Sequence, residues 1–208
     1  MLESRWLTHA KRLQAIASTG LSFTKDEFDC QRYREVADIA NSMLAELGSV
    51  PIERIVGLVS DFAKGYATPK IDVRGAVIED GKILLVREKS DGCWTLPGGF
   101  ADVGRSAAEN VVKEMHEEAG IAVSARGLYA VRHKAKRPYD PDARDFYKLF
   151  FLCERRDTAG PVTGTETSAV GFFPRHCLPE LSRGRVVASD IEAAFAFHDG
   201  SMKVTLFD

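Results

Sequence analysis

A glycine-rich segment followed directly by an acidic amphipathic helix is the feature that most constrains how this chain folds. Gly98 and Gly99 come shortly before a segment with strong helix signals at both ends. Ser106 and Glu109 have the spacing of a capping box, and Gly120 suits the left-handed residue that terminates a helix. We therefore predict a tight loop followed by a helix between Ser106 and Gly120.

Three carboxylates of this helix share one face. Glu114, Glu117 and Glu118 recur at i, i+3 and i+4, beside an apolar stripe that packs on the core. Like charges held so close repel one another, and a divalent cation removes that repulsion. Hard cations such as Mg²⁺ take oxygen ligands, so the Gly98 carbonyl is a further candidate. The alternative is a solvated acidic face in which Lys113 partly neutralises Glu117.

The first third of the chain reads as helical. Apolar residues recur at helical spacing from Trp6 onward, with a break that we place at Thr19-Gly20, where glycine suits a C-terminal cap. A second helix is predicted to end near Leu47, and a third to cover Ile52–Phe62. The stretch 64–69 has the composition of a linker.

After this linker the pattern changes to a mixture of strands and helices. Strands are predicted at 71–78, 83–86, 94–96, 121–133, 145–154 and 168–173. Asp80-Gly81 is predicted to form a tight hairpin turn, and a last helix to cover 187–198. Strands joined by hairpins and mixed with helices predict an α+β fold. We divide the chain into a helical N-terminal domain at 1–64 and a second domain at 68–208.

The bulk composition argues against several classes of protein. The 208 residues carry a net charge of −2, which gives no basis for a stable nucleic-acid partner. No run approaches the roughly 18 apolar residues of a membrane span, and the charged N-terminus does not lead into a signal-peptide core. The four cysteines lack metal-type spacing, so we expect them to be reduced in a cytoplasmic protein.

The loop and the acidic helix resemble the Nudix box, G-x5-E-x7-R-E-U-x-E-E-x-G-U, in which U is a bulky aliphatic residue. With Gly99 as the first glycine, seven of the nine fixed positions match when Met115 is counted as aliphatic. The matching residues are Gly99, Glu114, Met115, Glu117, Glu118, Gly120 and Ile121. So long a gapped pattern is specific, and on it the chain is identified as a member of the Nudix superfamily.

The similarity extends beyond the box. The N-terminal helical region looks like that of a Nudix subgroup linked to hydrolysis of nucleoside diphosphates joined to another group, CDP-choline and ADP-ribose among them. Segments 147–154 and 166–173 are similar to the C-terminal half of that subgroup. The resemblance implies an α/β/α sandwich around a mixed sheet. The apolar faces of the N-terminal helices exceed what so small a domain buries, which predicts a homodimer.

The resemblance also implies a metal site and a mechanism. It makes Glu114, Glu117 and Glu118 the ligands of Mg²⁺ or Mn²⁺, with the Gly98 carbonyl as a candidate fourth ligand. Water then attacks a pyrophosphate linkage, with Glu117 and Glu118 as catalytic residues. In many relatives the general base is a glutamate from a later loop, and Glu166 is the candidate here. The alternatives are that Glu117 is the base and that Glu166 is an exposed loop carboxylate.

Two box positions depart from the family pattern. Arg105 stands where the box has glutamate, and Lys113 stands where it has arginine. Two cations cannot form the usual supporting ion pair, and lysine lacks the planar fork that grips a carboxylate in bidentate fashion. Arg105 either meets a substrate phosphate or pairs with Glu109 or Asp102, and we favour pairing. A weak or inactive enzyme is a further alternative.

A cationic segment that follows the strand at 121–133 is predicted to select the substrate. His133, Lys134 and Arg137 are candidates to hold phosphates, and Tyr139 is a candidate to stack on a base. The segment is expected to be a mobile loop near the site. The alternative for Tyr139 is packing in the core.

These features predict a metal-dependent pyrophosphohydrolase whose substrate is a small nucleotide of the CDP-choline or ADP-ribose type. One rival is a Nudix hydrolase of a nucleoside triphosphate or of an RNA 5′ end. Another is a non-catalytic Nudix-like sensor that binds a nucleotide and regulates a partner. The intact set of Glu114, Glu117 and Glu118 favours the enzyme.

Overall fold

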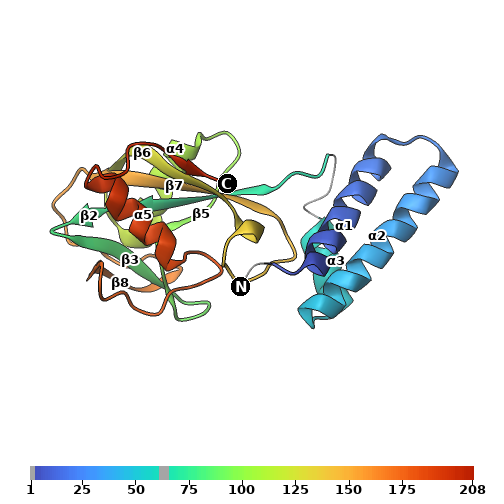
Figure 1. Ribbon diagram of the computed structural model, residues 1–208, viewed down its shortest axis with the longest axis horizontal. Helices are drawn as coiled ribbons and strands as arrows, with labels where there is room; N and C mark the ends of the chain where they lie inside the picture. The colour runs from blue at the N-terminus through green and yellow to red at the C-terminus, as the bar shows by residue number, and fades with distance from the viewer. Residues whose placement is uncertain (1–2, 61–65) are drawn as a thin grey trace. The chain divides into compact units, whose positions relative to one another are not determined.

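The computed structural model describes residues 3–60 and 66–208, and the chain divides into two compact units (Figure 1). The helical unit contains residues 1–70 together with 141–146, and the sheet unit contains 71–140 and 147–208. The short segment 141–146 therefore belongs with the N-terminal helices, although its place in the sequence assigns it to the second domain. Each unit has a hydrophobic core of its own.

Three helices form the helical unit: α1 (Arg5–Phe23), α2 (Glu27–Gly48) and α3 (Ile52–Ser60). Side-chain caps begin the first two, because Ser4 accepts a hydrogen bond from the Leu7 amide at 3.2 Å and Asp26 accepts one from the Asp29 amide at 2.9 Å. A hydrophobic cluster in this unit is formed by the buried residues Ala10, Leu44 and Ile55. The predicted end of the third helix at Phe62 lies outside the described residues.

Thr19-Gly20 does not end the first helix, contrary to the sequence-based prediction. α1 continues to Phe23, and the amide of Thr24 donates to the Gly20 carbonyl at 2.9 Å. The glycine serves packing instead, since a Cβ on Gly20 would overlap the ring of Tyr33 in α2. Within the described ranges, no helix combines the length and the apolar character that a membrane crossing requires.

The sheet unit is built on two sheets. Its strands are β1 (Lys70–Ala76), β2 (Ile78–Glu79), β3 (Lys82–Glu88), β4 (Trp94–Thr95), β5 (Gly98–Phe100), β6 (Val123–His133), β7 (Phe146–Arg155), β8 (Thr167–Pro174) and β9 (Leu206–Phe207). One sheet has the order β5-β1-β7-β6-β9, and in it β5 pairs antiparallel with β1, β7 pairs antiparallel with β6, and β6 and β9 run parallel. In the other sheet, β3 pairs with β2, β4 and β8.

The predicted hairpin turn is confirmed. Asp80 and Gly81 both have positive φ angles, +50° and +70°. Positive φ at both central residues is the geometry of a type I′ turn, whose twist matches that of the strands it joins. Ile78 faces Ile83 across the hairpin. The turn therefore fixes how β3 begins.

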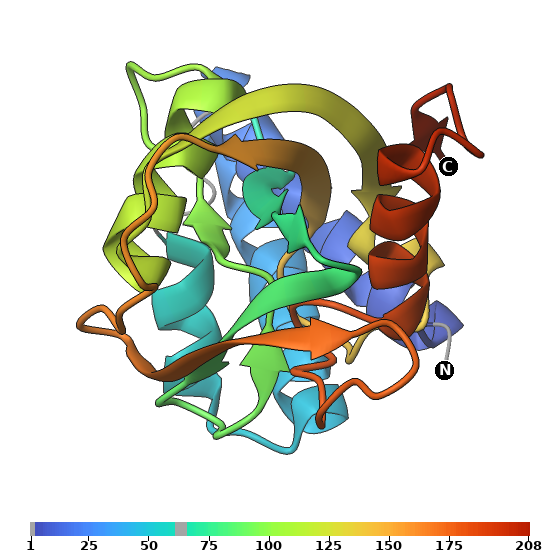
Figure 2. The same ribbon diagram turned by 90° about the vertical axis from the view of Figure 1, so that its left-hand side faces the viewer.

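Two helices cover opposite faces of the strands, which confirms the α+β sandwich (Figure 2). α4 (Ala107–Ala119) packs on one core and α5 (Ala188–His198) on the other. Alternate residues of β3 enter different cores: Ile83 lies in the core with α5, and Leu84 lies in the core with α4. Strands of this kind are apolar on both faces because both faces are covered.

A charged cluster lies buried in the sheet beneath the glycine-rich loop. Asp72 accepts two hydrogen bonds from Arg74, both at 2.9 Å, and a third from the Lys148 ammonium at 2.8 Å. All three residues are buried. Burial alone would raise the pKa of Asp72, but the two cations overcome it and hold the pKa far below its ordinary range. Arg74 also donates to the Leu96 carbonyl at 3.2 Å, so the cluster anchors the start of the loop.

Replacing Asp72 with asparagine is expected to destabilise the sheet unit by about 3–5 kcal/mol, because Arg74 and Lys148 lose their shared counter-charge while they stay buried. The free energy of unfolding can be measured in urea by the fluorescence of Trp94, in a background where the other tryptophan, Trp6, is changed to phenylalanine.

The matched control is Glu154→Gln, since Glu154 forms its ion pairs with Arg126 and Arg156 on the exposed surface. This variant should leave the free energy of unfolding almost unchanged. Equal stability of Asp72→Asn and Glu154→Gln would contradict a structural role for the buried cluster.

Candidate functional site

The acidic helix α4 is fixed at both ends, as the sequence predicts. The Ser106 hydroxyl accepts from the Glu109 amide at 3.2 Å, and the Ser106 amide donates to the Glu109 carboxylate at 2.7 Å. This reciprocal pair is a complete capping box. Gly120 ends the helix with a φ of +65°. The two ends set the rotation of α4 and therefore which side chains face the loop.

Glu118 lies against the glycine-rich loop. The Gly98 amide donates to its carboxylate at 2.9 Å, and the side chain is almost fully buried. Burial raises the pKa of Glu118 to about 7, although Arg74 and the Gly98 amide both act to lower it. Position 98 requires glycine, because its φ is +148° and a Cβ there would overlap the Val73 carbonyl. The loop thus approaches the carboxylate with bare backbone.

Glu114 lies beside the next residue of the loop. A Cβ placed on Gly99 would come within 3.1 Å of the Glu114 carboxylate, so this glycine also provides space for an acid. Burial raises the pKa of Glu114 above its ordinary value. Two carboxylates from one face of α4 therefore meet two consecutive glycines.

Lys113 gathers carboxylates around its ammonium group. Its Nζ lies 2.9 Å from Glu117, 3.2 Å from Asp102 and 3.5 Å from Glu114. The hydrogen bond to Glu117 raises the pKa of Lys113. The loop-to-helix ion pair therefore exists, but its acid is Asp102 and not the residue at the box position, which is Arg105. Sequence reasoning had named Asp102 only as a partner for that arginine.

The donor set fits a divalent cation by its chemistry. In the described residues, no three His, Cys, Asp or Glu side chains stand arranged around one point. The carboxylates nevertheless already hold a cation, the Lys113 ammonium. Burial raises the pKa of Glu118 to about 7, and a metal ion bound beside the carboxylate would favour its ionised form. Hard carboxylate oxygens beside a bare backbone loop suit a hard divalent cation.

Glu166 lies in an exposed position just before β8. Its carbonyl accepts from the Lys89 amide at 3.1 Å, which brings the loop to the end of β3. At this end of the strand the buried Glu88 is close enough to Glu166 for their charges to interact, and burial raises the pKa of Glu88. Arg185 pairs with Glu88 at 3.3 Å.

Sequence reasoning missed Glu88 and the buried trio of Asp72, Arg74 and Lys148. The signal for part of that trio was present in β1, where two charged residues stand at i and i+2 among apolar neighbours. That spacing places both side chains on one face of a strand. Glu88 gave no comparable signal, because a charged residue at the end of a strand is usually exposed.

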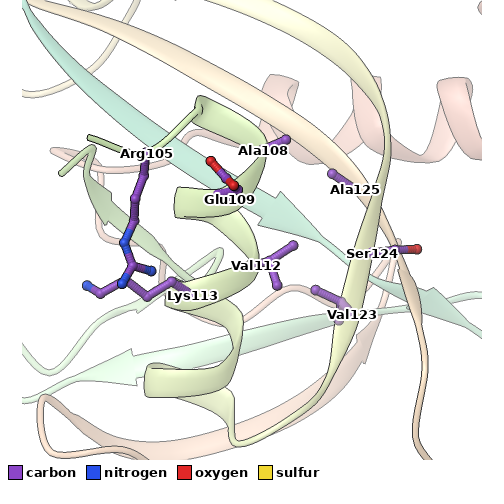
Figure 3. A pocket seen from close by; sticks show the side chains of 8 residues that line it. All are labelled: Arg105, Ala108, Glu109, Val112, Lys113, Val123, Ser124 and Ala125. Atoms are coloured by element: carbon purple, nitrogen blue, oxygen red, sulfur yellow. The ribbon is translucent and has the colours of Figure 1, made fainter. Parts of the chain in front are cut away.

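Arg105 is exposed, and no ion pair of its guanidinium is found in the part of the chain that the structure describes. It lines an open pocket of about 550 Å³ between α4 and the start of β6 (Figure 3). The lining residues are Arg105, Ala108, Glu109, Val112, Lys113, Val123, Ser124 and Ala125. The pocket borders the flank of α4 away from Glu118, and Lys113 stands at its edge.

The cationic segment after β6 is tied to the C-terminal strand. The Arg137 guanidinium pairs with Asp208 at 2.7 Å, and the His133 amide donates to the same carboxylate at 2.7 Å. Lys134 is buried in a short 3₁₀ helix (Lys134–Lys136). Specific contacts therefore hold this segment in place, whereas the sequence predicted a mobile loop.

Tyr139 is a core residue, which corrects the prediction that its ring meets a base. Only 2% of Tyr139 is exposed, and its hydroxyl donates to Asp190 in α5 at 2.7 Å. Neither face of the ring is available for stacking. The core packing that the sequence left as the alternative is the outcome.

Comparisons with known protein families match both parts of the chain. The family described as "UDP-X-like, N-terminal oligomerisation domain" matches residues 4–59, and the family described as "NUDIX domain" matches residues 69–194. A relative named putative ADP-ribose pyrophosphatase in Bacillus subtilis (strain 168) is 44% identical over 207 residues, which is 100% of this chain and 99% of the relative.

The chain is also similar to solved structures of pyrophosphatases and diphosphatases. The crystal structure of a UDP-X diphosphatase is 33% identical with a TM-score of 0.63, and the alignment covers 100% of both chains. The crystal structure of an ADP-ribose pyrophosphatase from Streptococcus suis is 36% identical with a TM-score of 0.59, covering 68% of this chain and 100% of that one.

Glu118 is expected to make the stability of the metal-free protein fall as pH rises. Burial raises its pKa from 4.5 to about 7, so between these values the folded state keeps a proton that the unfolded state has released. Stability is therefore lost as pH rises through this window, by about 3 kcal/mol in total. The measurement is urea unfolding from about pH 5 to about pH 8 in the presence of a chelator.

The Glu118→Gln variant supplies the reference for this experiment, since glutamine carries no titrating proton. The free energy difference between the two proteins should change in favour of the variant as pH rises, and excess Mn²⁺ should restore the wild type. Parallel pH profiles for the two proteins would contradict the raised pKa.

Proposed function

The chain belongs to the Nudix family, and we propose that it hydrolyses the pyrophosphate bond of a nucleoside diphosphate joined to a second moiety, of the ADP-ribose or CDP-choline type. The observation that carries the proposal is the meeting of Glu118 and Glu114 with the bare backbone at Gly98 and Gly99. Buried acids beside a loop without side chains leave room for a metal ion and phosphate oxygens.

The relatives that span the whole chain point to the same substrate class. One is named an ADP-ribose pyrophosphatase and another a UDP-X diphosphatase. Both names describe cleavage of a nucleoside diphosphate that carries another group. A nucleoside diphosphate derivative is therefore the first substrate to test for this chain.

The proposed metal is Mg²⁺ or Mn²⁺, held by Glu114, Glu117, Glu118 and the Gly98 carbonyl. When bound, the ion supplies charge that stabilises the phosphoryl oxygens and a water of lowered pKa. Glu166 is the proposed general base, because its loop is joined to the end of β3 beside the buried Glu88. The positive charge of the bound ion favours the ionised form of Glu118.

The residues proposed to contact the substrate are Arg105, His133, Lys134 and Arg137. Arg105 is the strongest of them, since it is exposed directly before the box helix. Arg137 pairs with the carboxylate of Asp208, and in the proposal a substrate phosphate takes the place of this carboxylate.

We also propose that the helical unit forms a homodimer. Its family description is that of an oligomerisation domain, and five apolar residues of its three helices are buried among those the structure describes, of which three are alanines: Ala10, Ala17, Ala40, Leu44 and Ile55. Phe28 and Ile39 of α2 are 71% and 53% exposed. They lie three helical turns apart on one face, since about 3.6 residues make a turn.

The hydrolase proposal predicts turnover of at least one compound in a panel of ADP-ribose, CDP-choline, UDP-sugars and nucleoside triphosphates with Mg²⁺ or Mn²⁺. Products are read by chromatography of the released nucleoside monophosphate. Glu117→Gln and Glu118→Gln should each lower kcat by about 100-fold or more, because each removes negative charge from the metal site. The exposed Glu154→Gln variant is the matched control and should be fully active.

Each outcome of the panel decides between the alternatives. Turnover confined to triphosphates or to capped RNA would replace the proposed substrate class with another Nudix substrate. Nucleotide binding without any turnover would favour the sensor and overturn the enzyme. Full activity of both glutamine variants would refute the metal ligands.

Phe28→Glu and Ile39→Glu are expected to convert the dimer into monomers, because each places a charge in an apolar contact. Sedimentation velocity measures the change. Arg34→Glu introduces the same side chain at an exposed position on another side of α2 and should leave the dimer intact. A wild-type protein that sediments as a monomer would refute the proposal.

A further inference from the structure

The loop before β8 rests on the last turn of the acidic helix. The Val162 amide donates to the Ala119 carbonyl at 2.9 Å, and the Gly164 amide donates to the Glu118 carbonyl at 3.3 Å. The last carbonyls of a helix have no partner within the helix. The loop therefore satisfies groups in the same turn that carries Glu117 and Glu118.

This contact has no spare room. A Cβ on Gly164 would overlap the Glu117 carbonyl, and a Cβ on Gly120 would overlap the side chain of Val162. The two glycines let the backbones of the loop and the helix touch directly. A backbone contact of this kind transmits a displacement of either partner to the other.

Thr167 joins the loop to the helix with a single hydroxyl group. Its Oγ1 donates to the Glu118 carbonyl at 3.0 Å and accepts from the Gly164 amide at 2.8 Å. Only 1% of the residue is exposed. The hydroxyl thus uses its donor and one acceptor position at once, in a buried site, where a hydrogen bond is stronger than at the surface.

The residue before Thr167 is Glu166, and its other side is also anchored. The Glu166 carbonyl accepts from the Lys89 amide at 3.1 Å, and the Lys89 ammonium donates to the Thr165 carbonyl at 2.6 Å. Thr167 itself pairs with Glu88 in the register of β8 with β3. The backbone of Glu166 is held between the box helix and the end of β3.

We propose that Thr167 is a positioning residue that sets the distance between the proposed general base, Glu166, and the metal-binding turn of α4. The proposal rests on the proposed hydrolase function. The hydroxyl links Gly164, on the near side of the base, to the backbone of Glu118, a proposed metal ligand. Without the hydroxyl, the loop keeps the backbone hydrogen bonds of Val162 and Gly164 to the helix but loses the side-chain link between Gly164, Thr167 and the Glu118 carbonyl.

The expected effect is on turnover rather than on binding. A shift of about 1 Å in a reacting group costs up to about 100-fold in rate, so Thr167→Val should lower kcat by about 10-fold to 100-fold. KM should change less than about 3-fold, because no substrate contact is removed. Thr167→Ser keeps the hydroxyl and should retain most of the wild-type kcat.

The decisive experiment places Thr167→Val in two backgrounds, the wild type and Glu166→Gln. Glu166→Gln alone should lower kcat by about 100-fold or more, as expected for loss of a general base. If Thr167 acts through Glu166, valine should then cause less than about a 2-fold further loss. Ser168→Ala is the matched control, since the Ser168 hydroxyl donates to the backbone carbonyl of Arg87 at an exposed site.

Hydrogen exchange measures the positioning directly, without substrate or metal. The Gly164 amide should exchange faster in Thr167→Val than in the wild type, because it loses its shorter hydrogen bond, and Thr167→Ser should restore slow exchange. Thermal unfolding of each variant shows whether it is folded. If valine prevents folding, Thr167→Ala is compared with Thr167→Ser in its place.

Loss of kcat with near-constant KM, rescue by serine and the absence of a further loss in Glu166→Gln together support the proposal. Equal losses in both backgrounds, or full activity of Thr167→Val, would overturn it. So would full activity of Glu166→Gln, because the base would then lie elsewhere. A wild-type protein without turnover refutes the proposed function instead, and the two failures are therefore distinguishable.

Discussion

The contact between the glycine-rich loop and the acidic helix depends on the close approach of strand β5 to β1, which only a residue without a side chain permits. A Cβ at Gly98 would overlap the Val73 carbonyl. Because the two strands meet there, the Gly98 amide reaches the carboxylate of Glu118, and Arg74 reaches the Leu96 carbonyl on the other side of the loop. The buried Asp72 in turn holds Arg74. Any side chain at position 98 would lift the loop from the helix and from its charged support at once.

The departures from the box pattern have a local compensation. The acid that supports the helix comes from Asp102, three residues before Arg105, and it meets Lys113 from the loop side. Lysine reaches Glu117 and Glu114 as well, since its single ammonium accepts several carboxylates without a preferred plane. Because the lysine ammonium has no preferred plane, its supporting acid can come from position 102 instead of position 105. The planar guanidinium of an arginine would require a more exact placement of that acid.

Local signals in the sequence predicted the features that depend on few residues. The Asp80-Gly81 turn, the capping box at Ser106 and the stop at Gly120 each follow from residues close in sequence, and the structure has all three. Features that depend on distant partners were missed or misplaced. Gly20 was predicted to end a helix because its packing partner, Tyr33, lies in the next one. Nothing adjacent to Tyr139 indicates its bond to Asp190. The roles of the site residues stay predictions.

The apolar character of β3 on both faces has a consequence for how the strand finds its register. Leu84 and Leu85 enter different cores, so a slip of one residue would still bury apolar side chains on each side. The hydrophobic pattern of β3 therefore distinguishes poorly between the correct register and one shifted by a residue. In a strand with one polar face, the same shift would bury the polar side chains and is strongly disfavoured. The register of β3 with β2 is set instead by the turn at Asp80-Gly81, because its two positive φ angles define a two-residue hairpin with one pairing of the strands. The turn thus fixes how β3 pairs with β2, whereas the residue opposite Thr167 in β8 is set by the register shift between Arg87 and Glu88 at the other end of β3.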